Sequence, residues 1–556
     1  MLSNVWEKPA SPDLRAARDN LLLGSVGKLH LMQTAKAFLR APETGDPENM
    51  FLYELGRDML LSAWEEDPLD GPSAARLLEE HEKGPWLDKA IADAAYAAQD
   101  HWRPPQDLSR FSHMISRREY DKITSYLLQQ TAKEPGNLFW RQKALAHAAA
   151  IQEPETARKA LDGPWPKELL FASHSIQAHI HFMNQDLERA ANLFEKAAGQ
   201  APLASLVEKK AEAHFRMQDT ETALSLWKDV IKKRPWHTNL ALRLYDALTG
   251  LDKKESRPPG EIAILVYSHN KVSDLEKTLT SLFQSDLGQA KVYVLDNGST
   301  DNTPQVLSAF KERQGKRLSV ITLPVNIGAP SARNWLLHLP EVCGTDWCAY
   351  LDDDAKLPQN WLSKLGAAAD AYPDAGVWGC RVCDFFAPHI MQNVDLHLLW
   401  EGGQKPRPAR PGQAASSIFT TSNLHLQVLD FGQFNYIRPC ASVTGCCHLF
   451  RTQTLLESGD FSVHLSPSQY DDLEHDLRLG VMRKGAVYQG HVRILHMKKT
   501  GKAGLTTQAE YGNAIANKHK VQAMHPPEQI EKIMAWEQEA LARDFMPKAE
   551  FVAREL

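Results

Sequence analysis

Up to about residue 251, apolar residues recur along the chain at spacings of three and four. This spacing places them on one face of a helix, so the pattern predicts a succession of amphipathic helices. Residues 251–260 are charged and then rich in proline and glycine, which is typical of a linker or domain start. The run 261–267 that follows is apolar and β-rich and predicts a strand. The sequence therefore predicts two parts of different secondary structure.

The helical part holds a repeat with a period of 33 residues. Alanines recur at this interval, a large apolar residue follows each after four positions, and prolines and further alanines keep the register: Ala157, Ala190, Ala223, Leu161, Phe194, Trp227, Pro202, Pro235, Ala178 and Ala211. A weaker earlier copy has Ile123, Leu127 and Pro135. The pattern resembles the tetratricopeptide repeat, a pair of antiparallel helices. An irregular bundle with accidental spacing is the alternative.

We expect these repeats in residues 105–252, and a helical region in residues 1–104 that caps or extends them. Repeats of this kind stack into a curved surface suited to protein or peptide segments. A protein or peptide partner is therefore expected for this part.

Strands and helices alternate after residue 260, with strands expected at 261–270, 291–301, 318–325 and 346–354 and helices at 272–285, 302–314 and 329–339. Such alternation predicts an α/β domain, placed at 260–505, with a mostly parallel sheet flanked by helices. Ligands of these sheets bind beyond the carboxyl ends of the strands. A helical tail is expected in 506–556.

Composition narrows the class of protein. Hydrophobic residues make up 43% and charged residues 24%, and the net charge is −6, which offers no general attraction to nucleic acid. No apolar run approaches a membrane span, and the N-terminus has no signal-peptide pattern, so a cytoplasmic location is expected. All seven cysteines lie between Cys343 and Cys447. They form either a structural zinc site that includes Cys380 and Cys383 or, as the favoured reading, reduced packing residues.

Six segments in a fixed order carry a resemblance to a known family: LVYSHN, VLDNGSTDNT, NIGAPSARN, YLDDDAKLPQNW, TGCCHLFR with SGDF, and YDDLEHDLR. Together they resemble the family 2 glycosyltransferases over about residues 261–500. The resemblance implies a GT-A fold, which is Rossmann-like, and transfer of a sugar from a nucleotide diphosphate donor with inversion at the sugar carbon.

The acidic run at the end of the fourth predicted strand suggests a metal site. Carboxylates cannot hold a diphosphate directly, but they hold the Mg²⁺ or Mn²⁺ that bridges to it. Residues i and i+2 share a face in an extended segment, so Asp352 and Asp354 point together. The resemblance implies that Asp354 binds the metal, that Asp352 lies near the ribose or a metal-bound water, and that Asp353 points elsewhere or meets the ribose. A solvated acidic turn is the alternative.

The resemblance also supplies one histidine as a metal ligand after the stretch VRIL. His496 is the candidate and His491 competes with it.

The catalytic base is expected in the segment 470–478. An acceptor hydroxyl must lose its proton to a carboxylate on the side opposite the leaving diphosphate. The resemblance places this base at Asp472, and Asp471 stands where the family usually has glutamate, as a contact to the acceptor. Acids at a helix N-terminus are also stabilised by the helix dipole, so capping is the alternative role.

The remaining candidates surround the donor and the acceptor. By resemblance Asp296 accepts hydrogen bonds from the base or ribose. Tyr267, His269 and Asn270 complete the nucleotide side, and Arg333 binds either a phosphate or an internal carboxylate. Trp361 and Trp400 either line an acceptor groove or fill the core. Mobile loops are expected at 402–417 and, closing over the diphosphate, at 498–507.

Three functions follow from these readings. The first is glycosylation of a protein, with flagellin as the specific expectation and a UDP-sugar as the donor. The second is glycosylation of a polysaccharide, lipopolysaccharide or lipid-linked glycan. The third is a non-catalytic scaffold, which the intact acids at positions 352, 354 and 472 disfavour.

Overall fold

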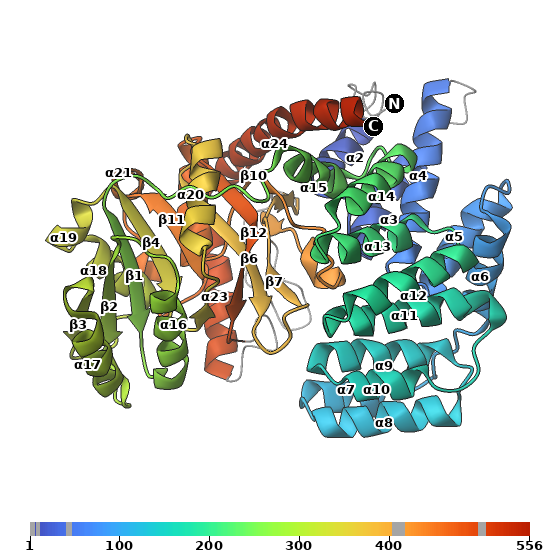
Figure 1. The fold of residues 1–556 in the computed structure, drawn as a ribbon, viewed down its shortest axis with the longest axis horizontal. Coiled ribbons are helices and arrows are strands. Elements are labelled where there is room, and N and C mark those ends of the chain that lie inside the picture. Colours follow the sequence, from blue (N-terminus) through green and yellow to red (C-terminus); the bar gives the residue numbers. More distant parts are fainter. Residues whose placement is uncertain (1–5, 7–11, 40–46, 403–416, 499–507) are drawn as a thin grey trace. The chain divides into compact units, whose positions relative to one another are not determined.

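The computed structural model describes residue 6 and residues 12–39, 47–402, 417–498 and 508–556 (Figure 1). They divide into two compact units. The helical unit comprises Met1–Tyr245, Gln427–Gln433 and Ala549–Leu556, and the sheet unit comprises Asp246–Leu426 and Phe434–Lys548. Among the described helices, none combines the length and apolar character that crossing a lipid bilayer requires.

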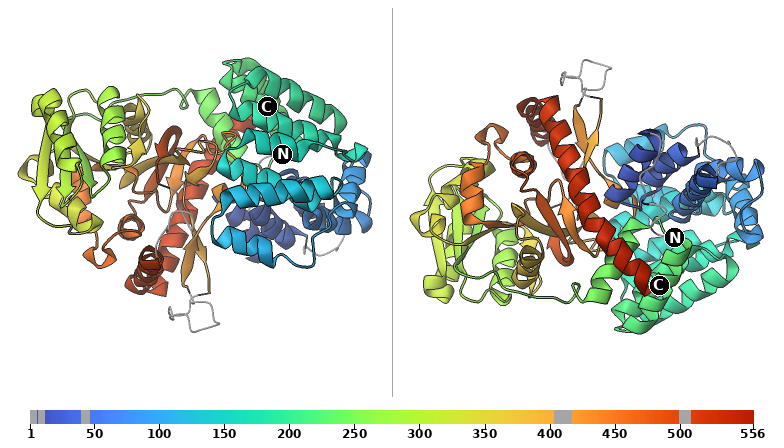
Figure 2. Two further views of the ribbon diagram at one scale, coloured as in Figure 1. Left: turned by 90° about the horizontal axis from the view of Figure 1, so that it is seen from below. Right: turned by 90° about the horizontal axis from the view of Figure 1, so that it is seen from above.

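The helical unit is built from successive α-helices, as the spacing of apolar residues predicts. They are α2 (Pro12–Leu23), α3 (Lys28–Phe38), α4 (Pro47–Glu65), α5 (Gly71–Glu82), α6 (Lys89–Asp100), α7 (Ser109–Ser116), α8 (Tyr120–Lys133), α9 (Leu138–Ile151), α10 (Pro154–Leu161), α11 (Leu170–Met183), α12 (Leu187–Gln200), α13 (Ala204–Arg216), α14 (Thr220–Lys233) and α15 (Thr238–Thr249). Helices α11 to α14 lie side by side in sequence order in the views of Figures 1 and 2.

The period of 33 residues is visible in the backbone. Helices α10, α12 and α14 begin at intervals of 33 residues. The turn before each holds one glutamine in the left-handed conformation, with φ of 55°, 63° and 66° at Gln152, Gln185 and Gln218. Non-glycine residues seldom adopt this conformation, so its recurrence marks one turn geometry used three times.

Packing explains the residue types that recur. Ala190 and Ala223 are fully buried, and so are Phe194 and Trp227 four positions later. A small residue lets neighbouring helices approach closely, and the large residue fills the space beside it. The helix-pair repeat of the sequence is therefore present in the structure, while the assignment to the tetratricopeptide class stays a prediction.

The sheet unit begins with the predicted alternation. Its elements are β1 (Ile262–Ser268), α16 (Val272–Gln284), β2 (Lys291–Asn297), α17 (Thr303–Gln314), β3 (Leu318–Leu323), α18 (Ala329–Leu337), α19 (Pro340–Cys343), β4 (Trp347–Asp352), β5 (Ala355–Lys356), α20 (Trp361–Ala371), β6 (Val377–Asp384), β7 (Met391–Asn393), β8 (Leu398–Trp400), β9 (Phe419–Thr421), β10 (Ile437–Cys440), β11 (Cys447–Arg451), α21 (Thr452–Ser458), α22 (Asp471–Val481), β12 (Ala486–His496), α23 (Gln508–Met524) and α24 (Pro527–Glu555).

One large sheet dominates this unit. Its strand order is β10-β12-β6-β11-β4-β1-β2-β3, with β5 paired to β12 and β7 to β6. Strands β4, β1, β2 and β3 are parallel, and β11 runs antiparallel between β4 and β6. The sheet is therefore mixed, with a parallel half built from the predicted alternation.

The register brings polar residues to one edge of the sheet. Tyr267 pairs with Asp352 across β1 and β4, and Ser268 pairs with Asp296 across β1 and β2. Both pairs lie at the carboxyl ends of parallel strands, which is where ligands of such sheets bind. We call this the carboxyl edge.

Helices cover the sheet and bury a continuous apolar core. Ile264 and Val294 of the strands belong to one buried cluster with Leu279 of α16 and Leu365 of α20. The stretch 384–440 contributes β7, β8, β9 and β10. Residues 403–416 and 499–507, on which the two predicted loops fall, lie outside the described residues. The helical tail predicted after residue 506 is present as α23 and α24.

Candidate active site

Asp354 and His496 face each other at the carboxyl edge. Strand β12 pairs with β5 so that His496 lies opposite Ala355, the residue after Asp354. This register places His496 Nε2 2.9 Å from Asp354 Oδ1. The Asp354 carboxylate is buried, and its Oδ1 is paired with the His496 ring. A carboxylate oxygen and an imidazole nitrogen this close can both be ligands of one metal ion.

Asp352 and Cys446 complete the group around His496. The Asp352 carboxylate, the Cys446 thiol and the His496 ring have ligand atoms within 4.8 Å of one another. The Asp352 amide also donates to the Cys446 carbonyl over 3.1 Å. Two carboxylates and an imidazole are donors that Mn²⁺ and Mg²⁺ accept, so the residues fit the expected cation. Sequence reasoning missed Cys446, because a cysteine entering a strand is ordinarily a packing residue.

Lys271 is a second residue that sequence reasoning missed. Its Nζ lies 3.0 Å from Asp353 Oδ1 and 2.7 Å from Asp354 Oδ2. Burial opposes ionisation of Asp354, but His496 and Lys271 together hold its pKa below the ordinary value. Burial raises the pKa of Asp353 to about 6 despite Lys271. Lys271 follows the segment LVYSHN directly, and this position is the one signal that the sequence held.

Arg333 lies between Asp352 of β4 and Asp471 of α22. It is 4% exposed, its Nη1 lies 2.8 Å from Asp471 Oδ2, and its Nη2 lies 3.7 Å from Asp352 Oδ1. Of the two readings of Arg333, the structure shows the internal carboxylate. Burial raises the pKa of Asp471 to about 6, opposed by Arg333 and reinforced by Asp472.

Asp472 begins α22 beside the same group. Its Oδ2 accepts from the Gly445 amide over 2.7 Å, and its Oδ1 accepts from the Leu473 amide over 2.9 Å. A Cβ on Gly445 would lie 2.6 Å from Arg333 Nη2, so a larger residue there would require the arginine side chain to shift. The Gly445 amide donates to the Asp472 carboxylate, and the carbonyl of the next residue, Cys446, accepts from the Asp352 amide. The two acidic clusters are therefore joined through adjacent residues, and Asp472 is half-buried with its carboxylate fixed.

Asp296 lies near the end of β2 at the carboxyl edge. It is 1% exposed, and its Oδ1 accepts from the Ser299 amide over 2.9 Å. Its Oδ2 is buried and accepts no hydrogen bond from the described residues, so it is available to a ligand. Tyr267 approaches the same edge, with its hydroxyl 3.5 Å from Asp352 Oδ1. Both residues lie at the carboxyl edge, and their contact with a base or ribose stays a prediction.

His269 and Asn270 shape the loop after β1. His269 Nδ1 lies 3.0 Å from the Asn297 carbonyl, and Asn270 Oδ1 accepts from the Thr300 amide over 2.7 Å. Asn270 has a φ of 52°, which asparagine tolerates better than most residues. Both side chains tie the loop after β1 to the loop after β2, and their contact with a nucleotide stays a prediction.

The two tryptophans that are predicted to contact an acceptor differ in their exposure to solvent. Trp361 is fully buried in the sheet core, and its indole Nε1 donates to Ser285 Oγ over 3.0 Å. The expectation that Trp361 contacts an acceptor is therefore wrong, because its ring has no accessible face. Trp400 is 40% exposed on β8, so its role stays a prediction. His491, the competing histidine, binds Asp246 Oδ2 over 2.8 Å and has a structural partner.

The cysteines do not gather into a zinc site. Among the described residues, Asp352, Cys446 and His496 form the single cluster of metal-binding side chains. Six of the seven cysteines are buried, and none forms a disulfide. The structure thus supports reduced packing residues over a cysteine zinc site that includes Cys380 and Cys383.

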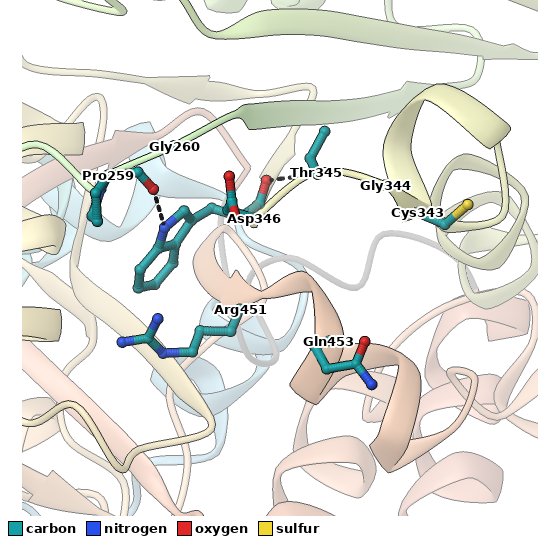
Figure 3. A pocket seen from close by; sticks show the side chains of 9 residues that line it. Pro259, Gly260, Cys343, Gly344, Thr345, Asp346, Arg451 and Gln453 are labelled. Atoms are coloured by element: carbon teal, nitrogen blue, oxygen red, sulfur yellow. Dashed lines mark hydrogen bonds between the residues drawn. The ribbon is translucent and has the colours of Figure 1, made fainter.

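A hollow of about 600 Å³ lies at the opposite edge of the sheet, where β1 and β4 begin (Figure 3). We call this the amino edge. Cys343, Arg451 and Gln453 surround the hollow in Figure 3, and Trp347 Nε1 donates to the Pro259 carbonyl over 2.9 Å. None of the predicted site residues lines it.

Part of the sheet domain is similar to a known family. Residues 263–425 match the family model "Glycosyl transferase family 2". No curated protein matches the sequence. The match and the mixed sheet with its parallel half confirm the predicted GT-A-like α/β domain preceded by an all-helical region.

Solved structures give low structural similarity. GalNAc-T7 with UDP, GalNAc and Mn²⁺ has a TM-score of 0.34 at 12% identity over 43% of this chain and 44% of that chain. S. aureus TarS has a TM-score of 0.30 at 15% identity over 43% and 36%. The mannosyltransferase PcManGT from Pyrobaculum calidifontis, in complex with GDP-Man and Mn²⁺, has 0.34 at 16% over 60% and 86%. This chain spans less than half the length of the first two.

Proposed function

We propose that this chain, whose residues 263–425 form a glycosyl transferase family 2 domain, transfers a sugar from a nucleotide diphosphate donor to a polypeptide with inversion. The observation that carries the proposal is the buried pair of Asp354 Oδ1 and His496 Nε2, 2.9 Å apart, with the Asp352 carboxylate beside the same histidine, at the edge that also holds Asp472. A site built for a cation and a site built for a base therefore share one edge of the sheet.

The donor end of the reaction belongs to Asp296 and the acids of β4. The unpaired Oδ2 of Asp296 accepts a hydrogen bond from the base or ribose. Asp352, Asp354 and His496 would hold Mn²⁺ or Mg²⁺, which when bound offsets the negative charge of the leaving diphosphate. Cys446 lies beside them as a protonated thiol, because burial raises its pKa well above the usual value.

Asp472 acts as the base in this proposal. Two backbone amides fix its carboxylate, and the N-terminus of α22 stabilises the anion. It accepts the proton of the acceptor hydroxyl while that oxygen bonds to the anomeric carbon. The bond from that carbon to the diphosphate breaks, and its electrons leave with the diphosphate. A single displacement of this kind inverts the configuration.

Arg333 and Lys271 position the acids. Arg333 bonds Asp471 and faces Asp352, so it keeps the start of α22 at the carboxyl edge. Lys271 restrains Asp353 and Asp354 from the loop before α16. Both cations also lower the repulsion among carboxylates that must remain ionised together.

The acceptor is proposed from the helical unit. Stacked helix pairs present a surface suited to polypeptide segments, which favours a protein acceptor such as flagellin, with a UDP-sugar as donor. Glycosylation of a lipopolysaccharide or lipid-linked glycan is the alternative outcome of the test. We place the chain in the cytoplasm, where such donors are synthesised.

The test incubates the purified full chain with radiolabelled UDP- and GDP-sugars, Mn²⁺, and separate protein and lipopolysaccharide fractions of its host. Label in a protein band that depends on Mn²⁺ supports the proposal, and label confined to lipopolysaccharide selects the alternative. The Asp472→Asn variant serves as the control for background. Neither transfer nor donor hydrolysis with any donor would reject an active enzyme.

A further inference from the structure

A short segment of the chain belongs to the helical unit although its neighbours in sequence do not. Residues Gln427–Gln433 group with the helices, whereas the residues before and after them group with the sheet. Phe431 is the centre of the contact and is 8% exposed. Its ring lies 4.8 Å from the ring of His179 and 4.7 Å from that of Phe182, both on α11. Phe194 of α12 meets it edge-on at 6.2 Å.

Helix α13 adds a cation to this aromatic contact. Lys209 Nζ lies 5.5 Å from the centre of the Phe431 ring. A cation near an aromatic face is attracted by the ring quadrupole, and the attraction strengthens as water is removed. Burial lowers the pKa of His179 well below its usual value, so this ring packs in its neutral form. The residues around Phe431 thus form a pocket for one aromatic side chain.

Helix α15 recognises the backbone of the same segment. Arg243 Nη1 donates to the Phe431 carbonyl over 3.3 Å, and Asn239 Nδ2 donates to the Gln433 carbonyl over 3.0 Å. Between them, Gly432 has a φ of 76°, and a Cβ there would lie 2.8 Å from both Arg243 Nη2 and Glu212 Oε1. Only glycine fits this approach.

The segment folds its own polar groups into a turn. The Gly432 amide donates to Asp430 Oδ1 over 3.0 Å, and the Phe431 amide donates to Gln433 Oε1 over 2.7 Å. The carbonyls of Phe431 and Gln433 are thus presented to the side chains of α15. A pre-formed turn loses little entropy on binding, which favours recognition by a fixed surface.

We propose that helices α11, α13 and α15 form a receptor for an aromatic–glycine turn, and that Gln427–Gln433 is its resident ligand. The receptor combines an aromatic pocket with two side chains aimed at carbonyls, which is recognition of a peptide by shape and backbone together. A polypeptide with the same chemistry reaches these helices only by displacing the segment. Covalent tethering gives the resident segment an effective concentration on the order of millimolar.

The experiment measures whether the receptor is already occupied. A fluorescent peptide with the sequence of residues 427–434 is titrated into the full chain and into the variant Phe431→Ala, with anisotropy as the readout. We expect the variant to bind the peptide at least about tenfold more tightly, because its own segment no longer fills the pocket. The same peptide with alanine in place of the phenylalanine that corresponds to Phe431 should not bind.

A second variant guards against loss of folding. Gly432→Val removes the segment from α15 without changing any helix, and it should open the receptor in the same way. Leu426→Ala is the matched control, because Leu426 is 65% exposed and lies just outside the segment. Peptide binding that is equal in the native chain and both variants, or absent from all of them, overturns the proposal.

Discussion

The two edges of the large sheet both carry polar side chains, but these side chains are used differently. At the amino edge, polar groups meet local partners. Asp346 Oδ2 accepts from the Glu261 amide over 2.7 Å, Thr345 Oγ1 donates to the Val342 carbonyl over 2.8 Å, and Arg451 lies over the Trp347 ring at 4.5 Å. Among the described residues that line the hollow, no buried side-chain nitrogen or oxygen lacks a hydrogen bond.

At the carboxyl edge, buried atoms lack partners. Asp296 Oδ2 and Arg333 Nε are both buried without a hydrogen bond to the described residues. Leaving a buried polar atom unpaired costs about 1–3 kcal/mol, so folding alone does not favour this arrangement. Buried polar atoms without partners, rather than the volume of a hollow, thus distinguish the carboxyl edge from the amino edge.

The largest effect at the carboxyl edge is expected from Asp472→Asn. We expect transfer to fall by about 10²–10⁴-fold, because the acceptor hydroxyl loses its proton acceptor. Donor binding should persist, since Asp472 is assigned no contact with the donor. Steady-state transfer assays and calorimetric titration with the donor separate the two effects. The exposed Asp370→Asn is the matched control, and normal transfer by Asp472→Asn would show that another group is the base.

Asp354→Asn tests the cation side of the same edge. Metal-dependent donor affinity should fall by at least about 100-fold, the upper end of the loss seen when a mere outer-shell partner of a metal is removed. Calorimetry with donor in Mn²⁺ and in chelator gives the measurement. Asp353→Asn keeps the other acids and should lose far less. Equal losses in both variants would contradict the assignment of Asp354 as a ligand.

The third prediction concerns the pH dependence of transfer. The pKa of Asp471 is raised to about 6, so its carboxylate becomes protonated as the pH falls below that value. Protonation weakens the pair with Arg333, and kcat/KM should fall about tenfold per pH unit below pH 6.

In the Asp471→Asn variant, kcat/KM should no longer fall as the pH drops below 6. Its value should be lower than that of the native chain at neutral pH. Because Asp353 also has a pKa of about 6, Asp353→Asn is the necessary comparison. If Asp353→Asn instead removes the fall of kcat/KM below pH 6, the pH dependence arises from the ion pair of Asp353 with Lys271.

The smallest effects are expected at the amino edge. Arg451→Ala removes the cation from the Trp347 ring, which should lower the free energy of unfolding by about 0.5–1 kcal/mol. Transfer should change by less than about twofold, because surface substitutions away from a site are nearly neutral. Chemical denaturation and the transfer assay measure both. A large loss of transfer with unchanged stability would show that the amino edge also takes part in the reaction.

Much of this molecule could be predicted from local pattern. Strands β1 to β4 and helices α16 to α18 follow directly from apolar runs and amphipathic spacing, since periodicity reports burial. The 33-residue repeat was visible for the same reason. Asp352 and Asp354 are singled out because acids that end an apolar run are unusual in sequence, whereas Asp472 and His496 are candidates through the resemblance to the family.

Other features depend on contacts between distant segments. Lys271 and Cys446 carry no pattern of their own, and only the sheet brings them beside Asp354 and Asp352. Whether Trp361 lines a groove or fills the core depends on its burial. The sequence around a single aromatic residue in a helix does not reveal that burial. The union of Gln427–Gln433 with the helical unit also has no local signature.

The sequence by itself determined which segments are helices and strands and which acids lie at strand ends, because these depend on neighbours within a few residues. The tertiary structure alone decided that Arg333 pairs with Asp471, that Gly445 and Cys446 join two acidic clusters, and that Phe431 lies among helices. Those outcomes depend on strand register and helix packing, which are set by the whole chain at once.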